Sequence, residues 1–280
     1  MLLTKAYLGA TEITKAYLGS TVVLEPVVAG LLLDIYPSAL MAFSLESLSS
    51  SYSGDVILAR RSTDSAELGF TATEVSNGTL LSWASGGDVF VKTWYDQSGN
   101  ANNATQATLG SQPRIIASGI FEPFGITGTG SSVLNVSGIS VSATTTFSSI
   151  RTPSTPTGNQ AVYQLGALNQ TSSVFNSSSL FYSRIGVAED LTTTTPSANT
   201  NYLVTANTTT SRTFRINGAE VASGSNITPT TGTEAHLFSL SSSKTYATNY
   251  SIAEMVVYPS DQSANYSGIE SNINSRYSIY

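Results

Sequence analysis

Residues 93–106 read Thr-Trp-Tyr-Asp-Gln-Ser-Gly-Asn-Ala-Asn-Asn-Ala-Thr-Gln. Residues 89–95, which lead into this polar run, alternate between two sets of side chains with the period of a β-strand. Asp96, Asn100 and Asn102 have short side chains that bond to nearby backbone, and Gly99 permits left-handed torsions. The stretch therefore predicts a strand that ends in a tight loop, whose polar groups satisfy one another.

The same loop has a functional interpretation as a calcium or sugar site, because carboxylate and amide oxygens suit hard cations and hydroxyl-rich ligands. It lacks the spacing of an EF-hand and has one carboxylate, so we predict no metal site and no cofactor. Trp94 shares a face with Lys92 and is expected near solvent, where an aromatic ring can stack on a sugar. Burial would explain Trp94 equally well, and core filling would explain Trp83 better. The candidate glycan face comprises Trp94, Asp96, Asn100, Asn102 and Trp83.

The rest of the chain also favours short strands, because turn signals follow one another at short intervals. Asn217-Gly218 lies between two apolar-alternating segments and predicts a hairpin with a type I′ turn. A helix is expected after Asp261, with an apolar stripe that ends at Tyr277, and residues 38–48 fit either a helix or a strand. The predicted strands are 56–61, 68–71, 89–95, 145–150, 161–165, 180–184, 202–206, 236–240 and 252–258.

Composition narrows the classes of protein. The 280 residues include 11% charged side chains, no cysteine and a formal net charge of −6. Disulfides and thiolate metal sites are therefore excluded, and binding to nucleic acid or to anionic lipid is disfavoured. No apolar run is long enough to span a membrane, and the N-terminus lacks the pattern of a signal peptide. We expect no membrane insertion and synthesis in a cytoplasm without processing.

Residues 39–116, with the Thr93–Gln106 phrase at their centre, resemble the sandwich domain of the arabinofuranosidase B family. Residues 251–258 and the segment after them resemble the last strand and tail of laminin G-like domains. Both resemblances imply an all-β, concanavalin A-like (laminin G-like) jelly-roll β-sandwich. We assign it to residues 37–280, with a short C-terminal helix and a small N-terminal β-hairpin arm.

The N-terminus carries a repeat, in which Thr-Lys-Ala-Tyr-Leu-Gly occurs at 4–9 and again at 14–19. The two copies are predicted to form the two strands of one hairpin, an arm over residues 1–25 followed by a linker at 26–36. The phrase resembles short tags in tail and fibre proteins of tailed bacteriophages. An incidental duplication in an ordinary edge hairpin is the alternative. The candidate anchoring and oligomerisation residues are Tyr7, Leu8, Tyr17 and Leu18.

Catalysis by the arabinofuranosidase family requires two carboxylates. None of the carboxylates in the later half of this chain lies in a phrase that matches the family's catalytic residues. The cysteines of the family are also missing from this chain. We therefore predict no enzymatic activity. Glu254 is expected to face solvent on its strand, and His236 to be a satisfied strand residue. The carboxylates considered are Glu189, Asp190, Glu220, Glu234, Glu254 and Glu270.

These observations predict a non-enzymatic bacteriophage virion structural protein, either a head fibre or decoration or a tail component. It would be a homo-oligomer held by capsid or tail proteins, assembled in the host cytoplasm and exposed on the particle, with host-surface glycan binding as an added activity. The alternatives are a carbohydrate-binding adhesin outside a virion and a divergent arabinofuranosidase-like glycosidase. Two carboxylates in one cleft would favour the glycosidase.

Overall fold

The computed structural model describes residues 7–8, 11–12, 16–18, 21–24, 30–156, 158–166, 172–177, 180–185, 188–191, 196–209, 211–225 and 231–280. The chain divides into two compact units, Met1–Gly30 and Leu31–Tyr280. The second unit is called the body below. It begins within the segment expected to be a linker, because Leu32 and Leu33 are buried in a hydrophobic cluster of the body.

The N-terminal unit contains two small hairpins where one was predicted. Strand β1 (Tyr7–Leu8) pairs with β2 (Thr11–Glu12), and β3 (Ala16–Leu18) pairs with β4 (Thr21–Leu24). Each copy of the repeat therefore pairs with the residues that follow it, since the short connection makes local pairing the easier closure. The side chains of Tyr7, Leu8, Tyr17 and Leu18 lie outside the described part of the structure, and their anchoring role stays a prediction.

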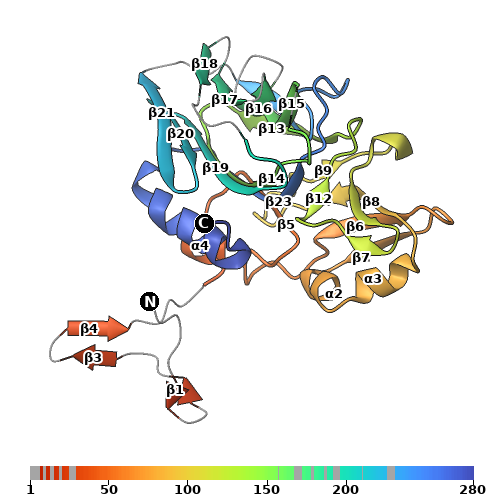
Figure 1. The fold of residues 1–280 in the computed structure, drawn as a ribbon, viewed down its shortest axis with the longest axis horizontal. Coiled ribbons are helices and arrows are strands. Elements are labelled where there is room, and N and C mark those ends of the chain that lie inside the picture. The colour runs from red at the N-terminus through yellow and green to blue at the C-terminus, as the bar shows by residue number, and fades with distance from the viewer. Residues whose placement is uncertain are drawn as a thin grey trace. The chain divides into compact units, whose positions relative to one another are not determined.

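The body is a sandwich of two antiparallel layers (Figure 1). The strands of the first layer run in the order β21 (Ala219–Ser225), β20 (Ser211–Ile216), β19 (Asn201–Thr208), β14 (Thr145–Arg151), β23 (Ser251–Tyr258), β5 (Met41–Ser44). Those of the second run in the order β13 (Leu134–Val141), β22 (Gly232–Leu237), β15 (Gln160–Leu165), β16 (Ser172–Ser177), β17 (Leu180–Ile185), β18 (Ala188–Leu191).

A third group of strands joins the two layers at one end. It contains β6 (Ile57–Arg61), β7 (Glu67–Phe70), β8 (Val89–Trp94), β9 (Ala104–Thr105), β10 (Arg114–Ala117), β11 (Ile120–Phe121) and β12 (Ile126–Thr127). Strand β12 pairs with β23, whereas β9 pairs with both β8 and β13. The two layers are therefore continuous through this group.

Alternation along β23 divides the apolar residues between two cores. Met255 and Val257 belong to the large cluster between the layers. Val256 and Tyr258 face the opposite way, into a smaller cluster with the C-terminal helix α4 (Tyr266–Tyr277). Figure 1 shows α4, in blue, on the opposite side of β14 and β23 from β13, β15 and β16. The prediction of an all-β sandwich with a short C-terminal helix is confirmed.

The other helices are short: α1 (Leu32–Ile35), α2 (Ala72–Ser76), α3 (Thr79–Ala84) and the 3₁₀ turns Leu109–Ser111 and Ser263–Asn265. Residues 38–48 hold strand β5, so the strand alternative was right there. Asp261 does not begin α4; its Oδ1 accepts a hydrogen bond from Ser263 N at 2.9 Å in the 3₁₀ turn that precedes the helix. No helix in the described ranges is long and apolar enough to cross a membrane.

The hairpin between β20 and β21 forms at the predicted turn. Asn217 and Gly218 both have positive φ, at 51° and 78°, as a type I′ turn requires. The prediction of this hairpin is confirmed.

Candidate functional site

Trp94 is fully buried, so it cannot offer a face to a ligand in solvent. The cause is a β-bulge: along β6 the neighbours Leu58 and Ala59 oppose Thr93 and Val91, which leaves Lys92 as an extra residue in β8. The extra residue reverses the alternation that the sequence suggests, and Trp94 turns inward to pack on Phe43 with ring centroids 5.6 Å apart. The expected solvent position of Trp94 is therefore wrong.

Asp96 is the centre of the loop between β8 and β9, and it is 3% exposed. Its Oδ1 accepts hydrogen bonds from Ala42 N at 2.8 Å and Ser98 N at 2.9 Å. Its Oδ2 accepts from Ser98 Oγ at 2.7 Å and from Asn102 N at 2.9 Å. Both carboxylate oxygens are thus engaged by the protein, as the self-satisfied loop predicted.

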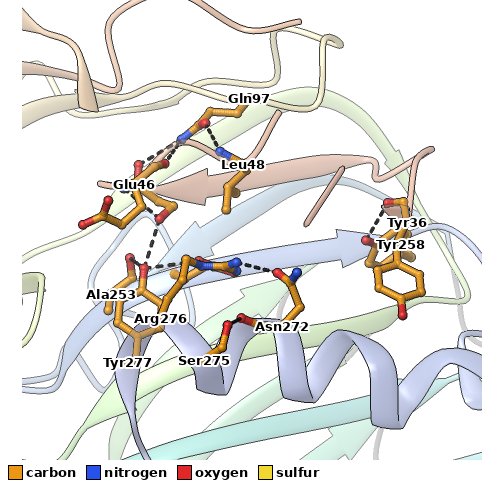
Figure 2. A network of polar contacts seen from close by, with 12 residues as sticks. Tyr36, Glu46, Leu48, Gln97, Ala253, Tyr258, Asn272, Ser275, Arg276 and Tyr277 are labelled. Atoms are coloured by element: carbon orange, nitrogen blue, oxygen red, sulfur yellow. Dashed lines mark hydrogen bonds and ion pairs between the residues drawn. The ribbon is translucent and has the colours of Figure 1, made fainter. Parts of the chain in front are cut away.

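The amides of this loop tie it to the segments on either side of β5. Gln97 Oε1 accepts from Leu48 N, and Gln97 Nε2 donates to the carbonyl oxygens of Ser44 and Glu46 (Figure 2). Asn100 Nδ2 and Asn102 Nδ2 both donate to Leu40 O, at 3.1 and 2.8 Å. The loop therefore fixes the two ends of β5.

Trp83 is half-buried on α3 and fills space beside the third strand group. Its ring lies 5.3 Å from that of Phe70 in an edge arrangement, and the Arg61 guanidinium lies 4.8 Å from its centroid. These contacts agree with core filling, the role that the sequence favoured for Trp83.

Two buried carboxylates, one on β23 and one on α4, form ion pairs between the helix and the sheet. Glu254 is 1% exposed and lies 2.6 Å from Arg276, so its expected solvent position is wrong: α4 covers that face of β23. Burial raises the pKa of Glu254, an effect that the Arg276 guanidinium counters. Glu270 pairs with Arg215 at 2.9 Å. These pairs hold the helix on the sheet.

His236 is buried on β22, as predicted for a satisfied strand residue. Its Nδ1 lies 2.8 Å from Asn135 Oδ1, and burial lowers its pKa.

A cavity of about 360 Å³ lies beside the C-terminal end of β5, and two glutamates are among its lining residues. We call it the carboxylate cavity. Its lining comes from the end of β5, the end of α2, β11 and the turn after it, β23 and α4. The lining residues are Leu45, Glu46, Val75, Ser76, Phe121, Glu122, Pro123, Phe124, Gly125, Ala253 and Tyr277.

The two carboxylates are held differently. Glu122 is an ion-pair partner of Arg114, with 2.6 Å between Oε1 and Nε, and its side chain is 9% exposed. Glu46 is exposed, and within the described residues its carboxylate makes no ion pair. Its backbone is fixed by Gln97 and by Ser44 Oγ, which accepts from Glu46 N at 3.0 Å. The cavity therefore combines one anchored and one exposed carboxylate.

Tyr277 joins the cavity to the buried pair beneath it. Its hydroxyl lies 3.1 Å from Ser44 Oγ and donates to Glu254 Oε2 at 3.2 Å; Figure 2 shows it reaching from α4 toward the Glu46 turn. Burial raises its pKa well above the ordinary value, so the hydroxyl stays protonated. The ring of Tyr277 packs edge-on against Phe124 at 5.6 Å. The aromatic wall is therefore rigidly supported.

Gly125 sets how closely this wall approaches β23. It has φ of +78°, and a Cβ atom there would lie 2.4 Å from Ile252 O and 2.6 Å from Ala253 Cα. Only glycine allows this approach.

No group of three or more potential metal ligands occurs among the residues that the structure describes. The cavity offers carboxylate acceptors, a serine hydroxyl and aromatic faces, a set that suits an uncharged hydroxylated ligand. Sequence reasoning missed Glu46 and Glu122, because neither lies in a recognisable phrase and they meet only through the fold. Of the predicted site residues, Asn100 and Asn102 lie together, at a different hollow.

No protein-family model matches the chain, and the search of curated proteins found no match. Solved structures do resemble it. An arabinofuranosidase complexed with arabinofuranosyl-α-1,2-xylobiose has a TM-score of 0.62 at 15% identity. An α-L-arabinofuranosidase soaked with a cyclic sulfate inhibitor has a TM-score of 0.59, also at 15% identity. Each alignment covers 84% of this chain, which spans 62% of the arabinofuranosidase's length.

A sialidase of Trypanosoma rangeli in complex with sialic acid gives a TM-score of 0.50 at 13% identity, covering 67% of this chain and 32% of the sialidase. At these identities the likeness shows a shared fold. The resemblance to the arabinofuranosidase sandwich is therefore confirmed as a resemblance of fold. The arabinofuranosidases are glycosidases, and this finding contradicts the expected role as a bacteriophage structural protein, for which the N-terminal repeat was the main support.

Proposed function

We propose that the body of this protein is a divergent, glycosidase-like domain that binds carbohydrate in the carboxylate cavity. One observation carries the proposal: Glu46 and Glu122 line the same cavity of about 360 Å³ as Phe121, Phe124 and Tyr277. A sugar has hydroxyl groups around its edge and apolar C–H groups on its faces. Carboxylates accept hydrogen bonds from the hydroxyl groups, and aromatic rings cover the C–H faces.

The fold supports the same class of ligand. The arabinofuranosidase with TM-score 0.62 is complexed with an arabinose-substituted xylobiose. The cavity volume lies near the lower end of the range for small-molecule sites, so it suits one or two sugar rings. Arabinofuranosyl-α-1,2-xylobiose is therefore the first probe.

Isothermal titration calorimetry tests the proposal with a matched pair of variants. Ser76 is an exposed residue of the cavity lining, and Ser76→Trp should fill the cavity and lower the affinity at least tenfold. Ser82→Trp makes the same change at an exposed position of α3 that does not line the cavity, and it should leave the affinity unchanged. Equal affinities in both variants and in the unaltered protein would place any bound sugar elsewhere.

Hydrolysis is a second candidate function, favoured by the presence of two carboxylates at one cavity. Glu46 would donate a proton to the departing oxygen of the glycosidic bond. Glu122 would take a proton from the water molecule that attacks the anomeric carbon. Alternatively, Glu122 would itself attack that carbon to form a glycosyl ester, which water then hydrolyses while Glu46 takes the proton of that water. In both routes water supplies the hydrogen and hydroxyl of the two products.

Release of 4-nitrophenol from 4-nitrophenyl α-L-arabinofuranoside measures this activity. Glu46→Gln and Glu122→Gln should each lower the rate by about 10²-fold or more, while Glu67→Gln, in an ion pair with Lys92, should not. A rate for the unaltered protein equal to that of buffer would leave a domain that binds sugar without cleaving it.

A further inference from the structure

A second concave region lies at the opposite end of β5 from the carboxylate cavity. It is a shallow hollow of about 560 Å³, bordered by Leu40, Asn100, Asn102, Ile139, Ser140 and Pro259. We call it the asparagine hollow. Its walls come from the segment before β5, the Asp96 loop, β13 and the residue after β23, so four separate parts of the chain build it.

The two asparagine side chains are fixed in orientation. Asn100 Nδ2 donates to Ala39 O at 2.9 Å and to Leu40 O at 3.1 Å, and Asn102 Nδ2 donates to Leu40 O at 2.8 Å. No hydrogen bond from a described residue reaches the Oδ1 atom of either side chain. Each amide is thus held by its nitrogen, and its acceptor oxygen is left for another donor.

The lining has no ionisable side chain. Ser140 at its border is exposed and carries a hydroxyl that can donate and accept. Leu40, Ile139 and Pro259 supply apolar surface between the polar groups. Fixed amide acceptors, a hydroxyl and small apolar patches without charge match a neutral ligand with many hydroxyl groups, and they offer nothing to attract an anion or a cation.

We propose that the asparagine hollow is a second carbohydrate site, which binds a neutral oligosaccharide independently of the carboxylate cavity. The amide oxygens of Asn100 and Asn102 accept hydrogen bonds from sugar hydroxyls. Because the loop already holds both amides in place, binding immobilises little of the protein. The proposal extends the proposed function to a new site and does not require the first site to be occupied.

Titration of ¹⁵N-labelled protein with arabinofuranosyl-α-1,2-xylobiose, xylotetraose and cellotetraose tests it directly. At least one probe should shift the side-chain amide signals of Asn100 and Asn102 in the unaltered protein. The same shifts should persist in Ser76→Trp, which fills the carboxylate cavity. Absence of any shift at these two amides with all three probes would overturn the second site.

A matched pair of variants on β13 separates this site from the first. Ser140→Trp should lower the affinity of the shifting probe at least tenfold, whereas Ser137→Trp, at an exposed position of the same strand, should not. If Ser140→Trp binds like the unaltered protein and only Ser76→Trp loses affinity, the proposed function stands and the second site is overturned. If only Ser140→Trp loses affinity, the second site stands and carbohydrate binding in the carboxylate cavity is overturned.

Discussion

The Asp96 loop and the carboxylate cavity both place acidic side chains near aromatic rings, but they use them differently. In the loop, both oxygens of Asp96 accept hydrogen bonds from the protein itself, and the neighbouring Trp94 is buried. In the cavity, the Glu46 carboxylate is exposed, and Phe121 lines the same space as Glu122. The carboxylate of a conspicuous polar phrase can therefore be structural, while the exposed carboxylate lies at a residue with no phrase around it.

The largest expected difference between the two regions is in stability. Asp96→Ala leaves three backbone N–H groups and the Ser98 hydroxyl without their acceptor in a buried place. It should lower the free energy of unfolding by about 3–5 kcal/mol. Glu46→Ala removes an exposed carboxylate and should change the free energy of unfolding by less than about 0.5 kcal/mol. Guanidinium unfolding measures the stability of both variants. Equal losses of stability would show that the two regions do not differ in this way.

Glycine substitutions compare the backbone of the two regions. Gly125→Ala should cost about 2–3 kcal/mol, because the new methyl group meets the backbone of β23 and φ is positive. Gly99→Ala, in the loop, has a positive φ but open space around it, so about 1 kcal/mol is expected. Thermal unfolding of the two variants ranks them; a smaller loss at Gly125 would mean that the cavity wall can move.

Affinity at the carboxylate cavity should respond to Glu122 and not to a similar ion pair elsewhere. Glu122→Gln should weaken binding of arabinofuranosyl-α-1,2-xylobiose about tenfold, or about 1.4 kcal/mol. Its stability should change by less than about 1 kcal/mol, because Arg114 is partly exposed. Glu67→Gln removes a comparable ion pair on the third strand group, away from the cavity lining, and should leave the affinity unchanged. Calorimetry on both variants decides whether the loss of affinity is specific to the carboxylate cavity. Equal losses in both variants would contradict this.

The smallest effect is expected at the edge of the loop. Asn103 Oδ1 accepts from Asp96 N at 2.9 Å, so Asn103→Ala should cost about 1 kcal/mol of stability and no affinity in the carboxylate cavity. Urea unfolding measures the stability of Asn103→Ala, and the same calorimetric titration measures its affinity for the sugar. A lower affinity would show that the loop contributes to the cavity.

Local pattern predicted much of the fold. The Asn217-Gly218 pair located a hairpin, and alternation located several strands of the body, because both depend on near neighbours in sequence. The strands that alternation located are β6, β7, β8, β14, β15, β17, β19 and β23. The position of Trp94 could not be predicted, because the bulge at Lys92 arises from pairing with β6. Burial of Glu254 depends on α4, which packs back over β23.

The candidate site was harder to predict than the fold for the same physical reason. Glu46 follows β5, whereas Glu122 follows β11, and each has ordinary neighbours in sequence. Their shared place in the cavity lining depends on the approach of Gly125 to β23 and on the Gln97 contact that fixes the Glu46 turn. Only the assembled sandwich brings the two carboxylates to one cavity.

A crystal structure of the protein soaked with arabinofuranosyl-α-1,2-xylobiose would test the central claim most directly. The proposal predicts density for a sugar ring in the carboxylate cavity, against Phe124 and within hydrogen-bond distance of Glu122. Clear density for the sugar elsewhere, with only water in the cavity at saturating ligand, would contradict it.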